Sequence, residues 1–396
     1  MKRKLSIAHL HWGFPPIIGG VETHLTFLLP EQVRQGHRVS LLTGSVDGTP
    51  VEDSFHGVAI SRTPMMDLNW LYKRGLNAIE IELRRIFSEF IERAKPDVLH
   101  AHNMHYFSLR HAEILAELAS QKKVPLILTA HNIWSDPLFL SIMRKIKWAH
   151  IIAVSHYIRQ ELIGIGIRQR KISTVHHGID AKMFRPRIDP KPIYKKYPQL
   201  KNRLVVFHPA RMGLAKGCDI SVKALRLIKA KFPNTILVLA GTKNIIDWGE
   251  TQKKDIAYIV ELVNFFNLRG NVMIDLYELK DMPLLYAASD VVVYPSSSQE
   301  PFGLTMLESM ASKKPIVVTR AGGMPEIIYD NINGFVIPTQ SFEELANRII
   351  QLLADKELRE RLGSTGREMV LQNFTTQVMT EKTINIYKKF LSRRKK

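Results

Sequence analysis

The alternation of short apolar runs with longer segments of helical spacing is the feature that most constrains how this chain folds. The run Leu5–Leu10 is followed by helical spacing over Val21–Gln35 and by a second apolar run at Arg38–Leu42. Short apolar runs indicate buried strands, and apolar residues three or four positions apart indicate a helix with one buried side. Strands and helices in alternation are typical of a parallel sheet covered by helices. We therefore predict an α/β fold.

The alternation occurs twice along the 396 residues, which are too many for one ordinary core. In the first half, further strands are expected at 58–62, 98–102, 125–129 and 150–154, and helices at 76–94, 109–120 and 137–147. Between Phe184 and Leu200, four prolines interrupt a segment without helical spacing. The pattern then resumes, with strands expected at 204–208, 235–240, 271–275, 290–294 and 315–319, and helices at 219–231, 255–266, 281–288, 304–312 and 375–396. We predict domains at 1–186 and 201–374, joined by a linker at 187–200.

The charge balance favours an anionic partner. Fifty-six Lys and Arg against 37 Asp and Glu give a net charge of +19, which fits nucleic acid, acidic lipid or a phosphorylated substrate. The positive charge is dispersed and no basic patch has interleaved aromatic residues, so we expect no nucleic acid partner. A single cysteine, Cys218, suits a reducing compartment, and no run of 18 apolar residues predicts a transmembrane helix. We expect a cytoplasmic protein.

Two glutamates stand where the strand expected at 290–294 gives way to a helix. Glu300 lies in the loop, and Glu308 lies about two turns beyond it at ~3.6 residues per turn. Phe302–Leu304 opens the helix, so its backbone N–H groups have no partner within the helix. Such an end suits a ligand with hydroxyls and negative charge. The alternative is a strand, a loop and a helix that carry two solvated glutamates.

Two other loops follow the first strand of each half. Gly19 and Gly20 stand between a strand and a helix, where glycine lets the backbone approach a ligand, although their spacing differs from the dinucleotide-binding pattern. Arg211 and Lys216 lie five residues apart on a glycine-containing loop and would clamp a diphosphate, Arg through its fork and Lys as a point charge. The alternatives are an ordinary turn and a surface loop with two solvated cations.

Histidines gather at the ends of two expected strands. Four fall within twelve residues, at His100, His102, His105 and His111, and His131 follows the strand at 125–129. The four invite a metal hypothesis, but they include no helical pair and have few carboxylates nearby, so we expect no metal. Ligands bind beyond the carboxyl ends of parallel strands. We therefore expect His102 and His131 to face a ligand, and a His131 that only caps the next turn is the alternative.

In this order, the segments resemble the family-four retaining glycosyltransferases, whose GT-B fold has two Rossmann-like domains facing a central cleft. The resemblance spans nearly the whole chain. Its most specific part is Glu300-Pro301-Phe302-Gly303-Leu304 through Glu308, which matches the family's E-x7-E motif. Further matches are 285–290, 321–326, 333–335, Gly19-Gly20-Val21-Glu22, His131, and Arg211 with Lys216-Gly217. The sequence departs from the family pattern at His177, where Asn is usual, and at Ala210, where Gly is usual.

The resemblance implies which residues bind and react. It implies donor-binding roles for Gly20, Arg211, Lys216, Glu300, Phe302, Gly303, Leu304 and Glu308, catalytic roles for His131, Arg211, Lys216 and Glu300, and acceptor-side roles for Gly19, His102 and His131. Glu308 would hold the ribose hydroxyls and Glu300 the hydroxyls of the transferred sugar. Arg211 and Lys216 would stabilise the departing diphosphate. The final helix at 375–396 would cross back and complete the first domain.

The reaction implied is the transfer of a hexosyl unit from a nucleotide-diphosphate sugar to a hydroxyl acceptor, with retention of configuration through same-face attack. No D-x-D metal motif is present, so we expect metal-independent chemistry and no cofactor beyond the sugar nucleotide. The segment Glu-Pro-Phe-Gly-Leu-Thr is similar to that of UDP-glucose-using relatives. We therefore favour UDP over GDP, and glucose or N-acetylglucosamine as the sugar.

Two hypotheses for the acceptor stay open. Pro64–Arg74 is an apolar loop with a basic end, and with the positive net charge it favours a lipid-linked acceptor and peripheral contact with the inner face of an anionic membrane. The other hypothesis is a small soluble acceptor, with this loop as a lid or as core. Rival functions are a nucleotide-sugar epimerase or hydrolase on the same fold and a non-enzymatic basic binding protein. The E-x7-E motif with Arg211 and Lys216 favours transfer.

Overall fold

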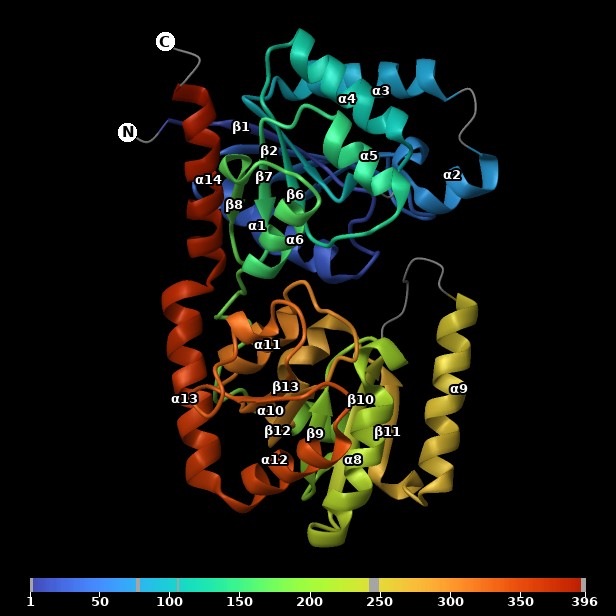
Figure 1. Cartoon of the computed structure of the whole chain (residues 1–396), viewed down its shortest axis with the longest axis vertical. Helices are drawn as coiled ribbons and strands as arrows, with labels where there is room; N and C mark the ends of the chain where they lie inside the picture. The colour runs from blue at the N-terminus through green and yellow to red at the C-terminus, as the bar shows by residue number, and fades with distance from the viewer. Residues whose placement is uncertain (1–2, 76–78, 105–106, 242–248, 393–396) are drawn as a thin grey trace. The chain divides into compact units, whose positions relative to one another are not determined.

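The computed structural model describes residues 3–75, 79–104, 107–241 and 249–392. The chain divides into two compact units, Met1–Gly178 with Thr376–Lys396, and Ile179–Thr375 (Figure 1). The first unit ends before the boundary expected at 186, because Ile179 donates a backbone hydrogen bond to Phe374 O at 2.8 Å within the second unit. His105 and residues 76–78 of the expected helix 76–94 lie outside the described residues.

The first unit is built on an eight-stranded sheet of order β3-β4-β2-β1-β5-β6-β7-β8. All neighbouring pairs are parallel except β3 with β4. The strands are β1 Ser6–Leu10, β2 Arg38–Gly44, β3 Glu52–Phe55, β4 Val58–Thr63, β5 Val98–His102, β6 Leu126–Ala130, β7 His150–Ala153 and β8 Ile172–Thr174. Strands β2 and β5 lie on opposite sides of β1, so the strand order reverses there. In open α/β sheets, such a switch point is where ligands bind.

Helices cover this sheet. They are α1 Gly20–Arg34, α2 Leu68–Arg74, α3 Glu80–Ala94, α4 Leu109–Gln121, α5 Pro137–Lys145, α6 His156–Gly164 and α14 Thr376–Ser392. Helix α14 lies beside the first sheet (Figure 1) and buries Met379, Ile384 and Tyr387 against Ile7 of β1 and Leu28 of α1. The final helix therefore belongs to the first unit, as the resemblance implied. None of the described helices is long and apolar enough to cross a membrane.

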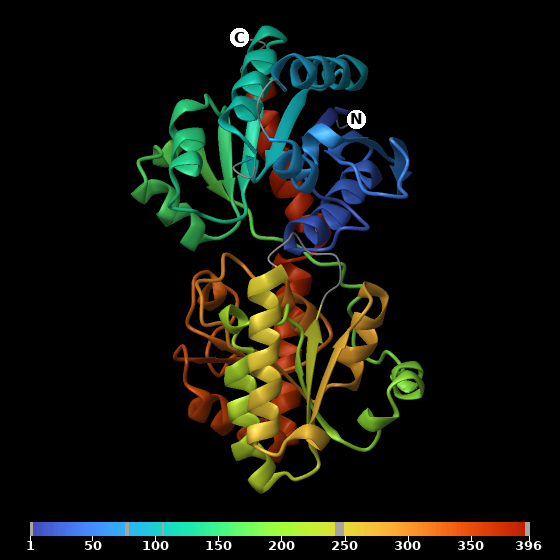
Figure 2. The same ribbon diagram turned by 90° about the vertical axis from the view of Figure 1, so that its right-hand side faces the viewer.

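The second unit is built on a six-stranded sheet of order β11-β10-β9-β12-β13-β14, in which every pair is parallel. The strands are β9 Leu204–His208, β10 Thr235–Gly241, β11 Val272–Leu276, β12 Val291–Tyr294, β13 Ile316–Thr319 and β14 Phe335–Ile337. The helices are α7 Lys191–Lys196, α8 Cys218–Lys231, α9 Gly249–Phe265, α10 Met282–Ala288, α11 Leu304–Ala311, α12 Phe342–Ala354 and α13 Lys356–Asn373. Figure 2 shows α9 running beside α8. The switch point of this sheet lies between β9 and β12.

Two segments expected to be irregular contain helices, so those expectations are wrong. At 187–200, prolines begin α7 and the 3₁₀ turn Pro198–Leu200, and Ile193 and Leu200 are buried. Proline interrupts a helix interior but is compatible with its first turn. At 64–74, a 3₁₀ turn leads into α2, whose N-cap Asp67 accepts the backbone N–H of Asn69 at 2.9 Å.

Candidate active site

The loops after β9 and β12, which carry the expected cations and the first glutamate, are bound to each other. Ala215 O accepts hydrogen bonds from Ser297 N at 3.1 Å, from Ser298 N at 3.2 Å and from Ser296 Oγ at 3.0 Å. Gly217 is required at this crossing, because its φ is +75° and a Cβ there would lie 1.9 Å from Pro295 O. The two loops therefore form one surface at the carboxyl ends of adjacent strands.

Lys216 and Glu300 form the central contact of this surface. Lys216 Nζ lies 2.5 Å from Glu300 Oε2, and their side chains are only 23% and 12% exposed. The Tyr294 hydroxyl, at the end of β12, donates to the same oxygen at 2.6 Å. Burial and the Glu300 charge hold the pKa of Tyr294 well above its usual range, whereas the Arg211 charge lowers it. Arg211 itself is exposed, so its guanidinium is accessible to an anion beside the Lys216–Glu300 pair.

The backbone of Glu300 is held by the loop after β13. Glu300 O accepts the Gly323 N–H at 2.8 Å, and a Cβ on Gly322 would lie 2.2 Å from that oxygen. Gly303 follows with φ +86° and caps α11, so Leu304 becomes the first helical residue. The first N–H groups of a helix have no acceptor within it. The neighbouring Phe302 side chain is 2% exposed, so the segment presents backbone to a ligand.

Glu308 lies inside α11 and is buried, with 7% of its surface exposed. Its Oε2 accepts the Tyr286 hydroxyl at 2.7 Å. Burial raises the pKa of Glu308 to about 7, and the Tyr286 hydrogen bond lowers it only in part. Glu300 and Glu308 are therefore not two solvated glutamates, and the alternative interpretation is wrong.

In the first unit, the two glycines of the loop after β1 differ from each other. A Cβ on Gly19 would lie 2.3 Å from Glu22 Oε2, so Gly19 makes room for a carboxylate of its own helix. That carboxylate is fixed by His11, whose Nε2 lies 2.8 Å from Glu22 Oε1. Gly20 is exposed, and nothing lies within 4 Å of a Cβ built there. Only Gly20 therefore leaves open space at the start of α1.

His102 and His131 lie in a cluster of buried histidines around the switch point between β1 and β5. His102 Nε2 contacts His9 Nδ1 at 3.0 Å, and His102 Nδ1 contacts His131 Nε2 at 3.0 Å. His24 and His177 complete the cluster, with ring centroids 4.2 Å apart. Desolvation by burial lowers the pKa of His131 well below its usual value, and the nearby His177 adds to this effect. The cluster is a neutral one at physiological pH.

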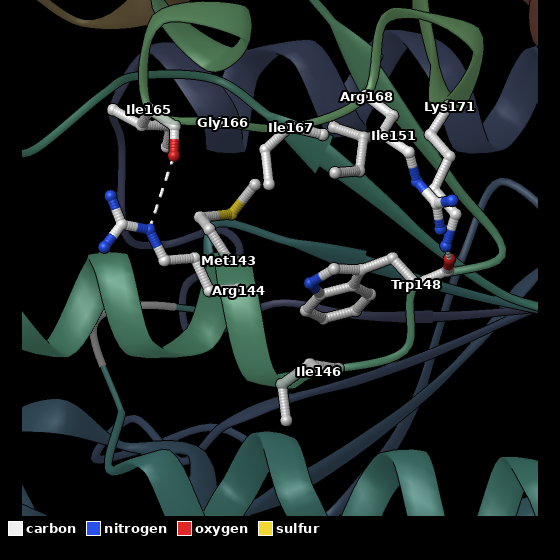
Figure 3. A pocket seen from close by; sticks show the side chains of 10 residues that line it. All are labelled: Met143, Arg144, Ile146, Trp148, Ile151, Ile165, Gly166, Ile167, Arg168 and Lys171. Carbon is white, nitrogen blue, oxygen red and sulfur yellow. Dashed lines mark hydrogen bonds between the residues drawn. The ribbon is translucent and has the colours of Figure 1, made fainter.

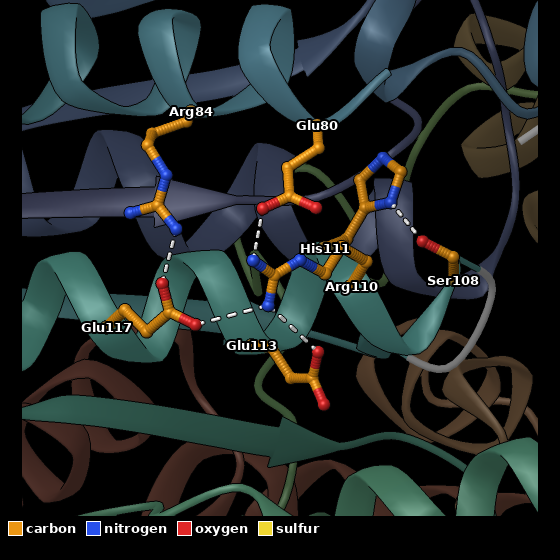
Figure 4. Close-up of polar contacts among 7 residues, drawn as sticks. All are labelled: Glu80, Arg84, Ser108, Arg110, His111, Glu113 and Glu117. Atoms are coloured by element: carbon orange, nitrogen blue, oxygen red, sulfur yellow. Dashed lines mark hydrogen bonds and ion pairs between the residues drawn. The ribbon is translucent and has the colours of Figure 1, made fainter. Parts of the chain in front are cut away.

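Two groups of these histidines have ring nitrogens close enough to hold a metal ion, His9 with His100 and His102, and His24 with His102 and His131. In the first group, both nitrogens of His100 already have partners, Tyr387 OH at 2.6 Å and Thr129 Oγ1 at 2.7 Å. His111 takes no part in either group. Figure 4 shows its Nδ1 toward Ser108, at 2.8 Å, and its Nε2 contacts Met65 O at 3.1 Å.

The polar contacts around Arg110 in Figure 4 join α3 and α4 and are structural. Arg110 pairs with Glu80, and its Nη1 lies 3.2 Å from both Glu113 and Glu117. All these side chains are at least one-third exposed. Such surface pairs contribute about 0–1 kcal/mol each.

A cavity of about 470 Å³ lies elsewhere in the first unit, beside the C-terminal end of α5 (Figure 3). Arg144 stands on one side of Trp148, and Arg168 and Lys171 stand on the other. Lys171 Nζ donates to Trp148 O at 3.0 Å. None of the residues that the sequence indicated lines this cavity, so its size does not mark the candidate site.

Several partners of the expected residues were missed from the sequence. Tyr294 and Tyr286 hydrogen-bond to the two glutamates, and His9 and Gln32 continue the histidine cluster. Tyr294 ends the strand just before the motif, which is a usable signal. Tyr286 lies in the segment 285–290 that matches the family, but nothing in the sequence pairs it with Glu308. His9 and Gln32 carried no signal, because only packing brings distant helices and strands together.

Two family models match this chain. The family model described as glycosyl transferases group 1 matches residues 191–369, and that described as Glycosyltransferase Family 4 matches residues 18–182. N-acetyl-alpha-D-glucosaminyl L-malate synthase of Bacillus anthracis is 25% identical over 94% of each chain. A GDP-mannose-dependent alpha-(1-6)-phosphatidylinositol monomannoside mannosyltransferase of Mycobacterium tuberculosis is 26% identical over 67% of this chain and 70% of its own.

Among solved structures, Anabaena HepE in complex with UDP and glucose aligns with a TM-score of 0.77 and 21% identity, over 97% of this chain and 100% of its own. That likeness supports the fold, with its two sheets of mainly parallel strands. The two family models cover the second and the first unit in turn. The chain therefore belongs to the group 1, family-four glycosyltransferases, and it is a glycosyltransferase of the GT-B fold.

Proposed function

We propose that this glycosyltransferase moves a hexosyl unit from a nucleotide-diphosphate sugar to a hydroxyl acceptor, with retention of configuration and without a metal. The observation that supports this most is the Lys216–Glu300 contact at 2.5 Å, at the switch point of the second sheet. A phosphate-binding cation and a hydroxyl-binding carboxylate in contact match a ligand that joins a diphosphate to a sugar. A ligand that carried only a diphosphate or only a sugar would engage only one of these two side chains.

The second unit supplies the donor site in this proposal. Glu308 accepts hydrogen bonds from the ribose hydroxyls. Glu300 accepts hydrogen bonds from the hydroxyls of the sugar, and the backbone N–H groups of Phe302, Gly303 and Leu304 donate to them. As the bond between the anomeric carbon and the diphosphate oxygen breaks, Lys216 and Arg211 stabilise the charge that develops on the leaving group. The acceptor oxygen bonds to the same face of the anomeric carbon, and its proton passes to the leaving diphosphate. In the first unit, Gly20 lets backbone approach the ligand and His131 contacts the acceptor. The expected acceptor contacts of Gly19 and His102 are not part of this proposal, because the Glu22 carboxylate lies against Gly19 and His102 is fully buried with both ring nitrogens bonded to other histidines.

For the donor, we favour UDP-glucose or UDP-N-acetylglucosamine. HepE was solved with UDP and glucose, and the Bacillus anthracis relative is named for N-acetylglucosamine, whereas the mycobacterial relative uses GDP-mannose. A panel of UDP- and GDP-sugars tests this choice, first by thermal shift and then by hydrolysis in the absence of acceptor. Stabilisation by a UDP-sugar alone is expected. Stabilisation by GDP-sugars alone would reverse the choice of nucleotide, and stabilisation by neither would overturn the donor site.

For the acceptor, the burial of 64–74 favours a small soluble molecule. Met65, Met66, Leu68 and Leu71 are each at most 2% exposed, so they pack as core and do not face a membrane. Of the large apolar side chains here, Tyr72 is exposed, at 70%. Sedimentation with acidic liposomes at low salt checks this, with no binding expected. Strong binding that Tyr72→Ala removes would restore the lipid-linked acceptor and the peripheral membrane location.

A further inference from the structure

A line of buried, hydrogen-bonded side chains crosses three neighbouring strands of the first sheet. The strand register places His9 of β1 opposite His100 of β5, and His102 of β5 opposite Thr129 of β6. Each step from His9 to His102 to His131 therefore moves one strand sideways and two residues toward the carboxyl edge. The line ends at the edge where ligands bind in parallel sheets.

Every link in this line has the length of an ordinary hydrogen bond. Gln32 Oε1 lies 2.9 Å from His9 Nε2, His9 Nδ1 lies 3.0 Å from His102 Nε2, and His102 Nδ1 lies 3.0 Å from His131 Nε2. Gln32, His9 and His102 are fully buried, and His131 is 6% exposed. Because solvent cannot replace a partner at such depth, each donor in the line must meet an acceptor.

The three imidazoles are neutral. Burial lowers the pKa of His9 to about 4 and that of His102 well below its usual value, and the neighbouring His100 and His131 lower the pKa of His102 further. Burial and the nearby His177 act on His131 in the same direction. A neutral imidazole has one N–H donor and one lone pair. Such rings in a line have two consistent arrangements, in which all donate through Nε2 or all donate through Nδ1.

Gln32 selects between the two arrangements. Its carbonyl oxygen faces His9, whereas its amide nitrogen faces the Tyr387 hydroxyl at 3.5 Å. An acceptor at this end requires the proton of His9 on Nε2, which leaves Nδ1 to accept from His102 Nε2–H. His102 Nδ1 then accepts from His131 Nε2–H. The last ring in the line is left with its lone pair on Nδ1.

We propose that Gln32, His9 and His102 are positioning residues that hold His131 in its Nε2-protonated tautomer and so present the Nδ1 lone pair of His131 to a ligand hydroxyl. Within the described part of the chain, His131 Nδ1 is buried and has no hydrogen-bond partner. A buried acceptor without a partner is costly, so this atom is prepared for a donor that arrives with the ligand. That the donor is a substrate hydroxyl rests on the proposed function, whereas the tautomer does not.

The ligand-free protein provides the first test. Long-range ¹H–¹⁵N spectra of histidine-labelled protein at pH 7.5 distinguish Nε2–H, Nδ1–H and doubly protonated rings. We expect His9, His102 and His131 all to carry the proton on Nε2. An Nδ1–H proton on His131, or a mixture of tautomers along the line, would overturn the proposal. So would a stoichiometric metal ion in the purified protein bound by His24, His102 and His131, because a metal takes the place of the proton that links His102 to His131.

Removal of the acceptor provides the second test. Gln32→Leu takes away the carbonyl oxygen that selects the direction, so His131 should divide between two tautomers. Because only one tautomer presents the Nδ1 lone pair, kcat/KM should fall in proportion to its population, about twofold for an equal mixture. Ser173→Ala is the matched control. It removes a hydroxyl 2.8 Å from His150 Nε2, on the same sheet but two strands away from β6, and should leave both the His131 tautomer and kcat/KM unchanged.

The outcomes separate this proposal from the function. An unchanged His131 tautomer in Gln32→Leu would overturn the line, whatever the activity. If Gln32→Leu does not fold, the wild-type spectrum decides alone. If the wild-type spectrum shows the expected tautomers and no nucleotide sugar is turned over, then the line stands and the proposed function fails.

Discussion

The two units place polar residues at the same point of their sheets but give them opposite electrostatic character. At the switch point of the first sheet, the cluster is made of histidines that burial holds neutral, with His102 between His9 and His131. At the switch point of the second sheet, the cluster contains the Lys216–Glu300 ion pair with the exposed Arg211 beside it. One topology therefore carries a hydrogen-bonding surface in one unit and a charge-stabilising surface in the other.

The difference in charge between the two clusters follows from how deeply their side chains are buried. His9 and His102 lie on strands and His131 directly follows β6. All three side chains are buried, and an imidazole tolerates burial by losing its charge. The cations of the second unit lie on a loop beyond β9, where a charge keeps part of its hydration. A hydroxyl acceptor needs oriented hydrogen bonds, whereas a departing diphosphate needs positive charge. Each unit thus suits one part of the proposed reaction.

The largest expected effect tests the charged cluster. Lys216→Ala should lower kcat by roughly 10²–10³-fold, the cost of removing one group that stabilises a developing charge, with the fold intact by circular dichroism. Lys223→Ala is the matched control, because Lys223 is 27% exposed and pairs with Asp219 at 2.8 Å on the neighbouring α8. Steady-state kinetics should show the control at wild-type activity. Normal turnover in Lys216→Ala would refute the assignment of this cluster.

The next largest effect tests whether a ligand approaches the backbone of the first unit at Gly20. In Gly20→Ala, the added Cβ has no protein atom within 4 Å. The free energy of unfolding should therefore stay the same or rise by up to about 1 kcal/mol. If backbone at Gly20 approaches the ligand, activity should still fall by up to about 10²-fold, because a small displacement of the reacting groups is costly. Gly164→Ala in α6, where a Cβ also meets nothing, should leave activity unchanged. Equal activities would show that Gly20 is only part of a turn.

A smaller effect concerns Glu308, whose carboxylate burial makes titratable near neutral pH. Ribose hydroxyls donate to the ionised form, and the pKa of Glu308 in the free protein is about 7. Donor affinity should therefore fall about tenfold between pH 8 and pH 6, as the carboxylate becomes protonated. Calorimetry with a UDP-sugar measures this. Glu308→Gln should bind more weakly at pH 8 and show a flat profile, and a flat profile in the wild type would remove the ribose role.

Glu308 also predicts a shift in stability. Its pKa is raised from 4.5 to about 7 in the folded protein, so its favourable contribution is complete below pH 4.5 and is lost as pH rises through 7. Glu308→Gln cannot ionise, and its stability relative to wild type should increase by roughly 2–3 kcal/mol between pH 5 and pH 8, at about 1.4 kcal/mol per pKa unit. Urea denaturation at both pH values checks this. The opposite sign would mean that Glu308 is ionised in the folded state.

Much of the fold followed from periodicity. Strands such as β1 and β5, and helices such as α1 and α8, were predicted to within a residue or two, because their apolar patterns are long and regular. The short helices α2, within 64–74, and α7, at 191–196, were missed. Prolines and a short apolar run hide helical spacing over so few residues. The short β14 was also missed, because three residues carry no period.

The candidate site was predicted in part. The glutamate pair, the cation loop and the strand-end histidines stood out because unusual residues follow strands at positions where parallel sheets bind ligands. The Lys216–Glu300 contact is consistent with that prediction, while the roles of the individual residues await the variants above.

The sequence by itself determined that this chain forms two α/β units and which loops carry charge, because both depend on local spacing. Only the tertiary structure decided that Tyr286 meets Glu308, that Gly19 makes room for Glu22 while Gly20 leaves open space, and that Gln32 directs a line of histidines toward His131. The physical reason is the same in each case. These contacts join residues from separate elements, and strand register, helix packing and burial place them together.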